Sequence, residues 1–300
     1  MCGIVGLFLK NETWRQQLGA LFSPMLIEMT DRGPDSAGVA VYHAHTADGG
    51  KVTCVHPDAA FDWAVLVARA QAQIGAEIVV RQRGSHTVLK TADAVALADF
   101  LRADCPQIDI VGVGDVIEIY KETGLPAHVC ESFGVAGMAG THAIGHTRMA
   151  TESAVTTAGS HPFSTGYDLC LVHNGSLSNH NRLREKLTAH EGVVFKTEND
   201  TEVGAAYIAS RLQAGRSLHQ ALEDSLNDLD GFFTFVAGTG GGFAVLRDPI
   251  ACKPAVLAET DDYVAFGSEF RALSSLPNID SAKLWEPEPA VVYSWEGQAA

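Results

Sequence analysis

The N-terminal part of the chain alternates between apolar runs and short polar turns. Residues 2–9, CGIVGLFL, form an apolar run of strand length, which predicts a buried strand. DRGPDSAG at 31–38 is dense in Gly, Pro and Asp and therefore predicts a loop, followed by a strand over 39–42. Between them, apolar side chains recur at helical spacing, at Leu18, Leu21, Phe22, Met25 and Met29. Pro24 within this stretch indicates a kink or the start of a helix.

Residues 43–140 have a different pattern from the segments on either side. Helices are expected over 62–73 and 92–103, and strands over EIVVRQ, HTVLKT and IDIVGV. We find no catalytic pattern within this region. It is predicted to be a small α/β insertion in a larger domain.

The second half of the chain is rich in strands and contains several helix starts. A strand that runs into a loop is predicted for GTHAIGHTRMAT, and a strand that ends in an Asn-Gly turn is predicted for LCLVHNGSLSN. Ser178 and Asp200 are each expected to cap a following helix, and Ser217 with Gln220 predicts a capping box. The Gly-rich stretch at 240–242 lacks a following helix, so we interpret it as a hairpin turn. Many strands with a few helices indicate an α+β fold in layers.

Composition and charge narrow the class of protein. The 300 residues are 46% hydrophobic, enough for one large domain or a domain with an insertion. The formal net charge of −15 argues against nucleic acid or an anionic membrane surface as partner. No leader peptide and no membrane-spanning run is apparent, so a cytoplasmic location is expected.

The cysteines and histidines do not form metal-binding patterns. Six cysteines are scattered without a CxxC pair, which argues against a zinc or iron–sulfur site and predicts free thiols. His142 and His146 have helical-pair spacing, but the residue after His142 is Ala143 and the surroundings are those of a strand. We expect neither a metal nor a cofactor in this chain.

Cys2 is the first candidate for chemistry. By residue type alone, a cysteine in an apolar N-terminal strand is more often a buried hydrophobe than a nucleophile. Removal of Met1, however, would leave Cys2 with a free α-amine. Such an amine has a reference pKa of about 8 and can act as the base that activates its own side chain.

Four further residues supply what a nucleophilic cysteine would need. The Asn174 amide and the Gly175 N–H could stabilise a tetrahedral oxyanion, although Asn-Gly is also a common turn. Arg148 could bind a carboxylate with two hydrogen bonds, although a lone arginine more often forms a surface ion pair. Asp200 could accept from a substrate ammonium and still cap a helix.

Several motifs in a fixed order carry a family resemblance over residues 1–42 and 140–275. The motifs are CGIVG at 2–6, DRGPDSAG at 31–38, HTRMAT at 146–151, HPF at 161–163, VHNGSLSNHNRLREKL at 172–187 and NDTEV at 199–203. With these motifs the chain resembles the glutaminase domain of class II glutamine amidotransferases, members of the N-terminal-nucleophile hydrolases. Met149, Glu152 and Ser153 depart from the sugar-phosphate members and argue against the hexosamine branch.

The resemblance implies a four-layer αββα sandwich, with residues 1–300 as a single amidotransferase domain. It implies that Cys2 attacks the side-chain amide of L-glutamine and forms a γ-glutamyl thioester, which water hydrolyses to glutamate. Asn174 and Gly175 match the oxyanion hole. The residues that match the substrate site are Arg148 for the α-carboxylate, Asp200 for the α-ammonium, and Thr151 and His173 beside them.

The resemblance also implies partners. The chain is similar to the separate amidotransferase subunits of glutamate-synthase-like systems, including N-methylglutamate synthase. There, ammonia passes to a synthase subunit, and the flavin and iron–sulfur sites are on other chains. Two alternatives stay open, a stand-alone amide hydrolase of the same fold and a non-catalytic assembly subunit. The ammonia acceptor and a homo-oligomeric state are also left open.

Overall fold

The computed structural model describes residues 2–45, 49–58, 60–150 and 154–296. The helices are α1 (Leu18–Glu28), α2 (Trp63–Ile74), α3 (Ala94–Asp104), α4 (Pro126–Phe133), α5 (His180–Glu191), α6 (Asp200–Gln213) and α7 (Leu218–Asp228). The strands are β1 (Gly3–Leu9), β2 (Ser36–Tyr42), β3 (Gly50–Val55), β4 (Ile78–Arg83), β5 (His86–Thr91), β6 (Asp109–Gly114), β7 (Ile117–Thr123), β8 (His142–Arg148), β9 (Cys170–Leu177), β10 (Gly231–Thr239), β11 (Gly242–Arg247), β12 (Val256–Glu259), β13 (Tyr263–Gly267), β14 (Lys283–Trp285) and β15 (Val292–Glu296).

Within the described residues the strands form three sheets. The large sheet has the order β14-β12-β13-β1-β8-β2-β7, and the second sheet has the order β15-β11-β10-β9. The insertion sheet has the order β4-β5-β3-β6. All neighbouring strands in these sheets pair antiparallel. Strand β1 lies in the middle of the large sheet, between β13 and β8.

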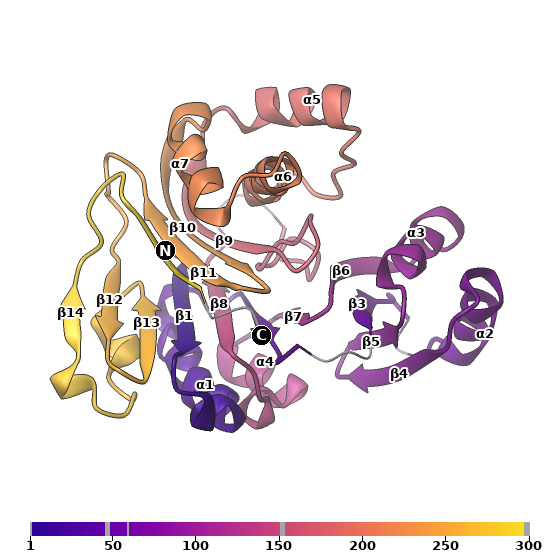
Figure 1. Cartoon of the computed structure of the whole chain (residues 1–300), viewed down its shortest axis with the longest axis horizontal. Coiled ribbons are helices and arrows are strands. Elements are labelled where there is room, and N and C mark those ends of the chain that lie inside the picture. Colours follow the sequence, from indigo (N-terminus) through magenta and orange to yellow (C-terminus); the bar gives the residue numbers. More distant parts are fainter. Residues whose placement is uncertain (1, 46–48, 59, 151–153, 297–300) are drawn as a thin grey trace.

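The large and second sheets are stacked, and helices cover their outer faces (Figure 1). Helices α1 and α4 lie on the large sheet, and α6 and α7 lie on the second sheet. Helix α5 packs against α6 on the side away from the sheet. Three buried apolar clusters fill the three interfaces between these layers, with residues such as Phe22 below the large sheet, Phe243 between the sheets and Leu222 above the second sheet. The αββα sandwich expected from the sequence is confirmed.

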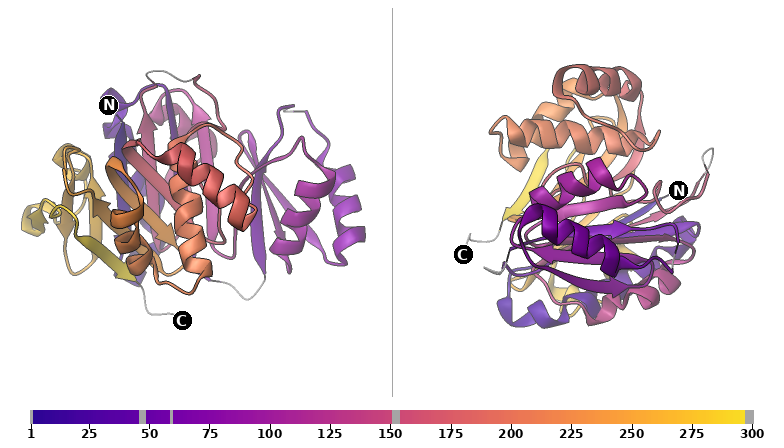
Figure 2. Two further views of the ribbon diagram at one scale, coloured as in Figure 1. Left: turned by 90° about the horizontal axis from the view of Figure 1, so that it is seen from above. Right: turned by 90° about the vertical axis from the view of Figure 1, so that its right-hand side faces the viewer.

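The insertion protrudes from one end of this sandwich (Figure 2). It contains β3, α2, β4, β5, α3 and β6, and its own apolar cluster packs the two helices on the insertion sheet. The insertion sheet covers only residues 50–114, which is narrower than the predicted segment 43–140. Strand β7 pairs with β2 and therefore belongs to the large sheet. Helix α4 buries its apolar face against the same sheet.

Several local predictions can be compared with the structure. Ser217 and Gln220 form the expected capping box, and residues 240–241 turn between β10 and β11. The helix-cap predictions at Ser178 and Asp200 were wrong, because Asn179 and Asn199 occupy the N-cap positions. Asn199 accepts from the Thr201 N–H, which leaves the Asp200 carboxylate available for other bonds. Among the described residues, no helix is long and apolar enough to cross a membrane.

Candidate functional site

Cys2 lies immediately before β1 and is partly buried. Its backbone carbonyl accepts two hydrogen bonds, from Arg32 Nε at 2.9 Å and from Asn174 Nδ2 at 3.2 Å. Arg32 comes from the short 3-10 turn before β2, and Asn174 comes from β9 of the second sheet, so two distant segments fix the start of β1. Such convergence on one backbone position, made by two side chains that are themselves buried, is typical of a preorganised site.

The register of the large sheet brings Arg148 next to Cys2. Gly3 pairs with Thr147 on β8, and Arg148 follows Thr147 at the end of the same strand. On the other side of β1, the Ile4 N–H donates to Ser268 Oγ at 2.9 Å and the Ser268 N–H donates to the Ile4 carbonyl. The first residues of β1 are therefore held from both sides.

The DRGPDSAG loop supports the backbone around Arg148. A Cβ at Gly33 would lie only 2.4–2.5 Å from backbone atoms of Thr147 and Arg148, so the close approach requires glycine. The Asp35 N–H donates to the Arg148 carbonyl, and Asp35 Oδ2 accepts from the Ala150 N–H at 2.8 Å. The Arg148 side chain is buried, and its Nη1 donates to the Gly159 carbonyl at 3.2 Å.

Asn174 and Gly175 lie at the end of β9, beside β10. The Asn174 side chain is only 3% exposed. Gly175 has φ +151°, and a Cβ there would lie 1.9 Å from the Phe232 carbonyl oxygen. The Asn-Gly pair is thus not a hairpin turn, because both residues lie within a strand and pair with Thr234 and Phe233.

Asp200 begins α6 and is tied back to the same strand. Its Oδ2 accepts from the Leu177 N–H at 2.8 Å, and its Oδ1 lies 3.7 Å from His173 Nδ1. Burial alone would raise the pKa of Asp200, but the His173 ring, the Leu177 N–H and the nearby His180 outweigh it and hold that pKa below its usual value. The carboxylate is therefore ionised at neutral pH and can face a cation.

His173 lies behind Asp200, within the second sheet. Its side chain is buried, its Nδ1 lies 3.1 Å from Thr201 Oγ1, and its ring packs edge-on against Phe235. Thr201 Oγ1 also lies 2.8 Å from His161 Nε2. His173 and His161 are thus linked through the residue that follows Asp200.

His146 adds a third imidazole to this buried layer. Its ring stacks on His161 at 3.9 Å, and its Nε2 lies 3.1 Å from the His173 carbonyl oxygen, to which it donates. Burial lowers the pKa of His146 to about 3, and it lowers the pKa of His161 well below its ordinary value. Both rings are neutral at physiological pH, so they act here as packed hydrogen-bonding groups.

Sequence reasoning missed Arg32 as a site residue. The Arg32 side chain is 7% exposed, and its Nη1 forms an ion pair with Glu269 at 2.6 Å in addition to the Nε bond to Cys2. The signal was present, because Arg32 lies in the DRGPDSAG motif. Its partner Glu269 is 237 residues away, and no sequence motif around Glu269 indicates that it pairs with Arg32. Thr151, which sequence analysis assigns to the substrate site, lies outside the described residues.

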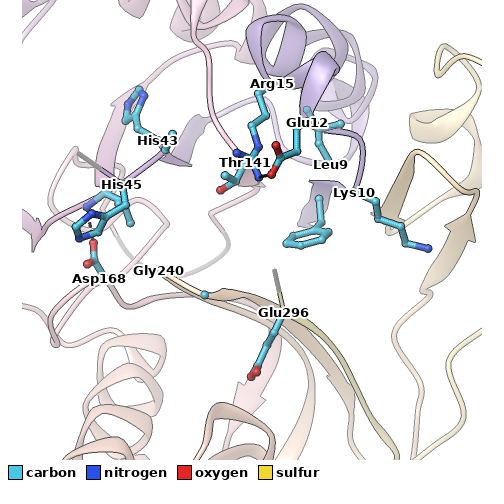
Figure 3. Close-up of a pocket in the computed structure, with 14 residues that line it drawn as sticks. Leu9, Lys10, Glu12, Arg15, His43, His45, Thr141, Asp168, Gly240 and Glu296 are labelled. Carbon is cyan, nitrogen blue, oxygen red and sulfur yellow. Dashed lines mark hydrogen bonds and ion pairs between the residues drawn. The ribbon is translucent and has the colours of Figure 1, made fainter. Parts of the chain in front are cut away.

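Figure 3 shows a cavity of about 790 Å³. It lies at the C-terminal end of β1, whereas Cys2 precedes the N-terminal end. Its walls include Phe8, Leu9 and Lys10, and the length of β1, about 20 Å, separates them from Cys2. On its rim Lys10 pairs with Glu259, and Arg15 pairs with Glu12. None of the site residues expected from the sequence lines this cavity.

The groups at the Cys2 end of the sandwich suit one class of ligand. The backbone of Cys2 is bonded to the buried Asn174 amide, and Gly175 follows Asn174 on β9. An amide and a backbone N–H can stabilise the oxyanion of an acyl-transfer reaction. Arg148, at the adjacent strand end, can bind a carboxylate, and ionised Asp200 can bind an ammonium. This set fits an α-amino acid whose side chain carries a carbonyl group.

Known proteins resemble the chain over its whole length. It is 59% identical to the glutamine amidotransferase-like protein GlxB of Rhizobium meliloti. The alignment of 303 residues covers 100% of both chains. It is 31% identical over 307 residues to a putative glutamine amidotransferase of Methanothermobacter thermautotrophicus, with 98% of this chain and 99% of the relative covered. The profile of the glutamine amidotransferase domain matches residues 146–275.

The fold is also similar to a solved structure. Glutamine phosphoribosylpyrophosphate amidotransferase from B. subtilis superposes with a TM-score of 0.60 at 20% identity. The match covers 98% of this chain and 49% of that chain, so this chain spans about half its length. The sequence relatives and the αββα fold agree. The chain therefore belongs to the class II glutamine amidotransferases, enzymes with the N-terminal-nucleophile hydrolase fold.

Proposed function

We propose that this protein hydrolyses the side-chain amide of L-glutamine through Cys2 and supplies the ammonia to a separate synthase subunit. The observation that supports this proposal most directly is that Arg32 and Asn174 both donate hydrogen bonds to the Cys2 carbonyl. A cysteine that served only the core would not need two buried polar side chains from distant segments on its backbone. Arg148, beside it, provides a group for the substrate carboxylate.

The chemistry follows from the groups at the start of β1. Once Met1 is removed, the α-amine of Cys2 takes the thiol proton, and Sγ attacks the side-chain carbonyl carbon of glutamine. Asn174 Nδ2 and the Gly175 N–H stabilise the oxyanion. The C–N bond then breaks, the α-ammonium returns its proton to the leaving nitrogen, and ammonia departs. Water attacks the γ-glutamyl thioester, which releases glutamate and restores the thiol.

Substrate recognition is divided between two charged groups. Arg148 binds the α-carboxylate, and Asp200 binds the α-ammonium, with Thr151 completing the pocket. His173 lies behind Asp200 and is buried, so we assign it the role of orienting that carboxylate. This assignment modifies the direct substrate contact that sequence analysis expects for His173.

The synthase partner is the less constrained part of the proposal. The resemblance to separate amidotransferase subunits supports a glutamate-synthase-like complex, with N-methylglutamate synthase as one acceptor system. In such a complex the flavin and iron–sulfur sites belong to other chains. A cytoplasmic location, a single amidotransferase domain over 1–300 and docking of the partner through the insertion belong to the same proposal.

The first experiment is an intact mass and an N-terminal peptide map, before and after treatment with 6-diazo-5-oxo-norleucine. We expect loss of Met1 and a single adduct on Cys2, and no adduct in Cys2→Ala. Retained Met1 without an adduct would reject the catalytic role of Cys2 and favour a non-catalytic assembly subunit.

Glutamine hydrolysis with and without candidate synthase subunits then separates the remaining functions. A stand-alone hydrolase would be fully active alone and would accept other amides, whereas an amidotransferase subunit would be stimulated by its partner. Replacing the insertion sheet region, residues 50–114, by a short linker tests docking. We expect complex formation to be lost while near-ultraviolet circular dichroism shows a folded core, and an unaffected complex would exclude this docking site.

A further inference from the structure

The segment 156–162 lies between the two charged groups assigned to glutamine recognition. Its Gly159 carbonyl accepts from Arg148 Nη1 at 3.2 Å. Two residues later, His161 Nε2 lies 2.8 Å from Thr201 Oγ1, and Thr201 follows Asp200 at the start of α6. One short segment thus contacts the Arg148 guanidinium at one point and the neighbourhood of Asp200 at another.

Lys121 holds this segment from below. It lies on β7 of the large sheet, and its side chain is 5% exposed. The Nζ donates to the carbonyls of Ala158 at 3.1 Å, Ser160 at 2.8 Å and Pro162 at 3.4 Å. An ammonium has three N–H donors, and the three carbonyls therefore match its full donor capacity.

The sheet surface next to Lys121 is shaped to receive the segment. Lys121 pairs with Gly38 of β2, and a Cβ at Gly38 would lie 2.2 Å from the His161 carbonyl oxygen. The segment thus rests directly on the backbone of β2, where only glycine leaves room. Glu122, the next residue of β7, accepts from Thr157 Oγ1 and adds a second attachment.

We propose that Lys121 is a positioning residue for glutamine recognition. By holding three carbonyls of segment 156–162, it fixes the separation of Arg148 and Asp200, so that both can reach the same α-amino acid. This role rests on the proposed function, because it takes glutamine as the ligand of Arg148 and Asp200. Lys121 itself does not contact the substrate.

The charge of Lys121 gives the proposal a pH signature. Burial lowers the pKa of Lys121 to about 8, while Asp109 and Glu202 raise it and Lys196 lowers it further. Above pH 8 the amine becomes neutral and its hold on the three carbonyls weakens. We therefore expect the KM for glutamine to rise in this range, and to rise less in Lys121→Arg, whose guanidinium stays charged. The ammonium of glutamine itself titrates equally with both proteins.

The test compares Lys121→Met with Lys121→Arg and the wild-type enzyme. We expect Lys121→Met to raise KM about tenfold or more with little change in kcat, because charge-assisted bonds that orient the binding groups are lost. Alkylation of Cys2 by iodoacetamide, which needs neither Arg148 nor Asp200, should be unchanged. Lys10→Met is the matched control, because its ammonium pairs with Glu259 and is not among the charges that act on Lys121.

Hydrogen exchange of peptides spanning 156–163 provides a readout that does not depend on catalysis. Faster exchange is expected in Lys121→Met but not in Lys10→Met. An unchanged KM and unchanged exchange in a folded Lys121→Met would overturn the role of Lys121 alone. If Lys121→Met does not fold, identical pH profiles of KM for wild type and Lys121→Arg would overturn it. A wild-type enzyme without glutaminase activity would instead reject the proposed function.

Discussion

The side-chain amide of Asn174 donates to the backbone carbonyl of Cys2 at 3.2 Å, across 172 positions of sequence. An Asn side chain has two amide hydrogens, and this bond uses one of them. We propose that the second hydrogen bonds the oxyanion that develops at the substrate carbonyl. In the proposed mechanism a single amide thus fixes the backbone of the nucleophile and stabilises the charge that the nucleophile generates.

Asn174→Ala is the direct test of this double role. We expect kcat for glutamine hydrolysis to fall about 100- to 1000-fold, because an oxyanion donor is lost, whereas KM should change little. Steady-state kinetics with glutamine measures both constants. Thermal unfolding shows whether the variant retains the fold.

Arg32→Met serves as the comparison, because it removes the other bond to the Cys2 carbonyl without removing an oxyanion donor. Its kcat should fall by only about tenfold, the amount expected from one lost charge-assisted hydrogen bond. Equal losses in the two variants would contradict an oxyanion role for Asn174 and leave only backbone positioning.

Gly175→Ala tests the backbone beside the nucleophile. A methyl group there would lie 1.9 Å from the Phe232 carbonyl oxygen, on a residue with φ +151°. We expect the free energy of unfolding in urea to decrease by about 3 kcal/mol or more, because backbone strain and overlap act together.

The matched control is Gly192→Ala at the C-terminal end of α5. Gly192 also has positive φ, +70°, but a Cβ there meets no atom within 4 Å. Its substitution should cost about 1 kcal/mol, the strain of the left-handed conformation alone. Similar losses in both variants would show that close contact with Phe232 does not determine the requirement for glycine.

Features encoded by short stretches could be predicted from the sequence. The apolar run before Lys10 became β1, and Ser217 with Gln220 formed the capping box, because both depend on neighbouring residues. The family and the αββα fold followed from ordered motifs. The motif residues Asn174 and Asp200 lie near the Cys2 end of the sandwich, although their catalytic roles stay predictions.

Features that depend on distant partners could not be predicted. Arg32 shares the site because Glu269 and the Cys2 carbonyl meet it in the folded chain. The extent of the insertion sheet could not be predicted, because β7 has the alternation of any strand and its place in the large sheet depends on pairing with β2. The helix cap at Asp200 was wrong because Asn199, the adjacent residue, can cap equally well.

The buried neutral histidines predict a loss of stability in weak acid. Burial lowers the pKa of His146 and of His142 to about 3, against about 6.5 in the unfolded chain. Below pH 6.5 the unfolded state binds protons that the folded state does not, so the free energy of unfolding decreases as pH falls toward 3. Each such histidine should contribute a loss of about 2 kcal/mol between pH 7 and pH 5.

His146→Gln isolates one of these contributions. The amide replaces a hydrogen-bonding ring without a titrating group, so the variant should be less stable at pH 7 but lose about 2 kcal/mol less between pH 7 and pH 5. Urea unfolding at a series of pH values in this range measures the difference and avoids the titration of most carboxylates. Parallel stability curves for wild type and variant would contradict a neutral His146.

Glu118 on β7 joins the insertion to the large sheet through buried charge. Its side chain is 2% exposed and accepts from Tyr120 and Arg81, with Lys51 Nζ at 3.0 Å and His43 Nε2 at 3.2 Å. Burial would raise the pKa of Glu118, but the neighbouring His43, Lys51 and Arg81 outweigh it and hold that pKa well below its usual range. The carboxylate therefore stays ionised and paired until strong acid.

Glu118→Gln should uncouple the insertion more than it unfolds the sandwich. Lys51 and Arg81 come from β3 and β4, so loss of the carboxylate leaves insertion cations without their buried partner. We expect a decrease of about 3 kcal/mol in the free energy of unfolding, together with faster hydrogen exchange in peptides from residues 50–114. The exposed pair of Glu223 with His219 is the control, and Glu223→Gln should change stability by less than about 0.5 kcal/mol. If exchange increased equally in the sandwich and the insertion, Glu118 would be a general core charge and not the attachment point of the insertion.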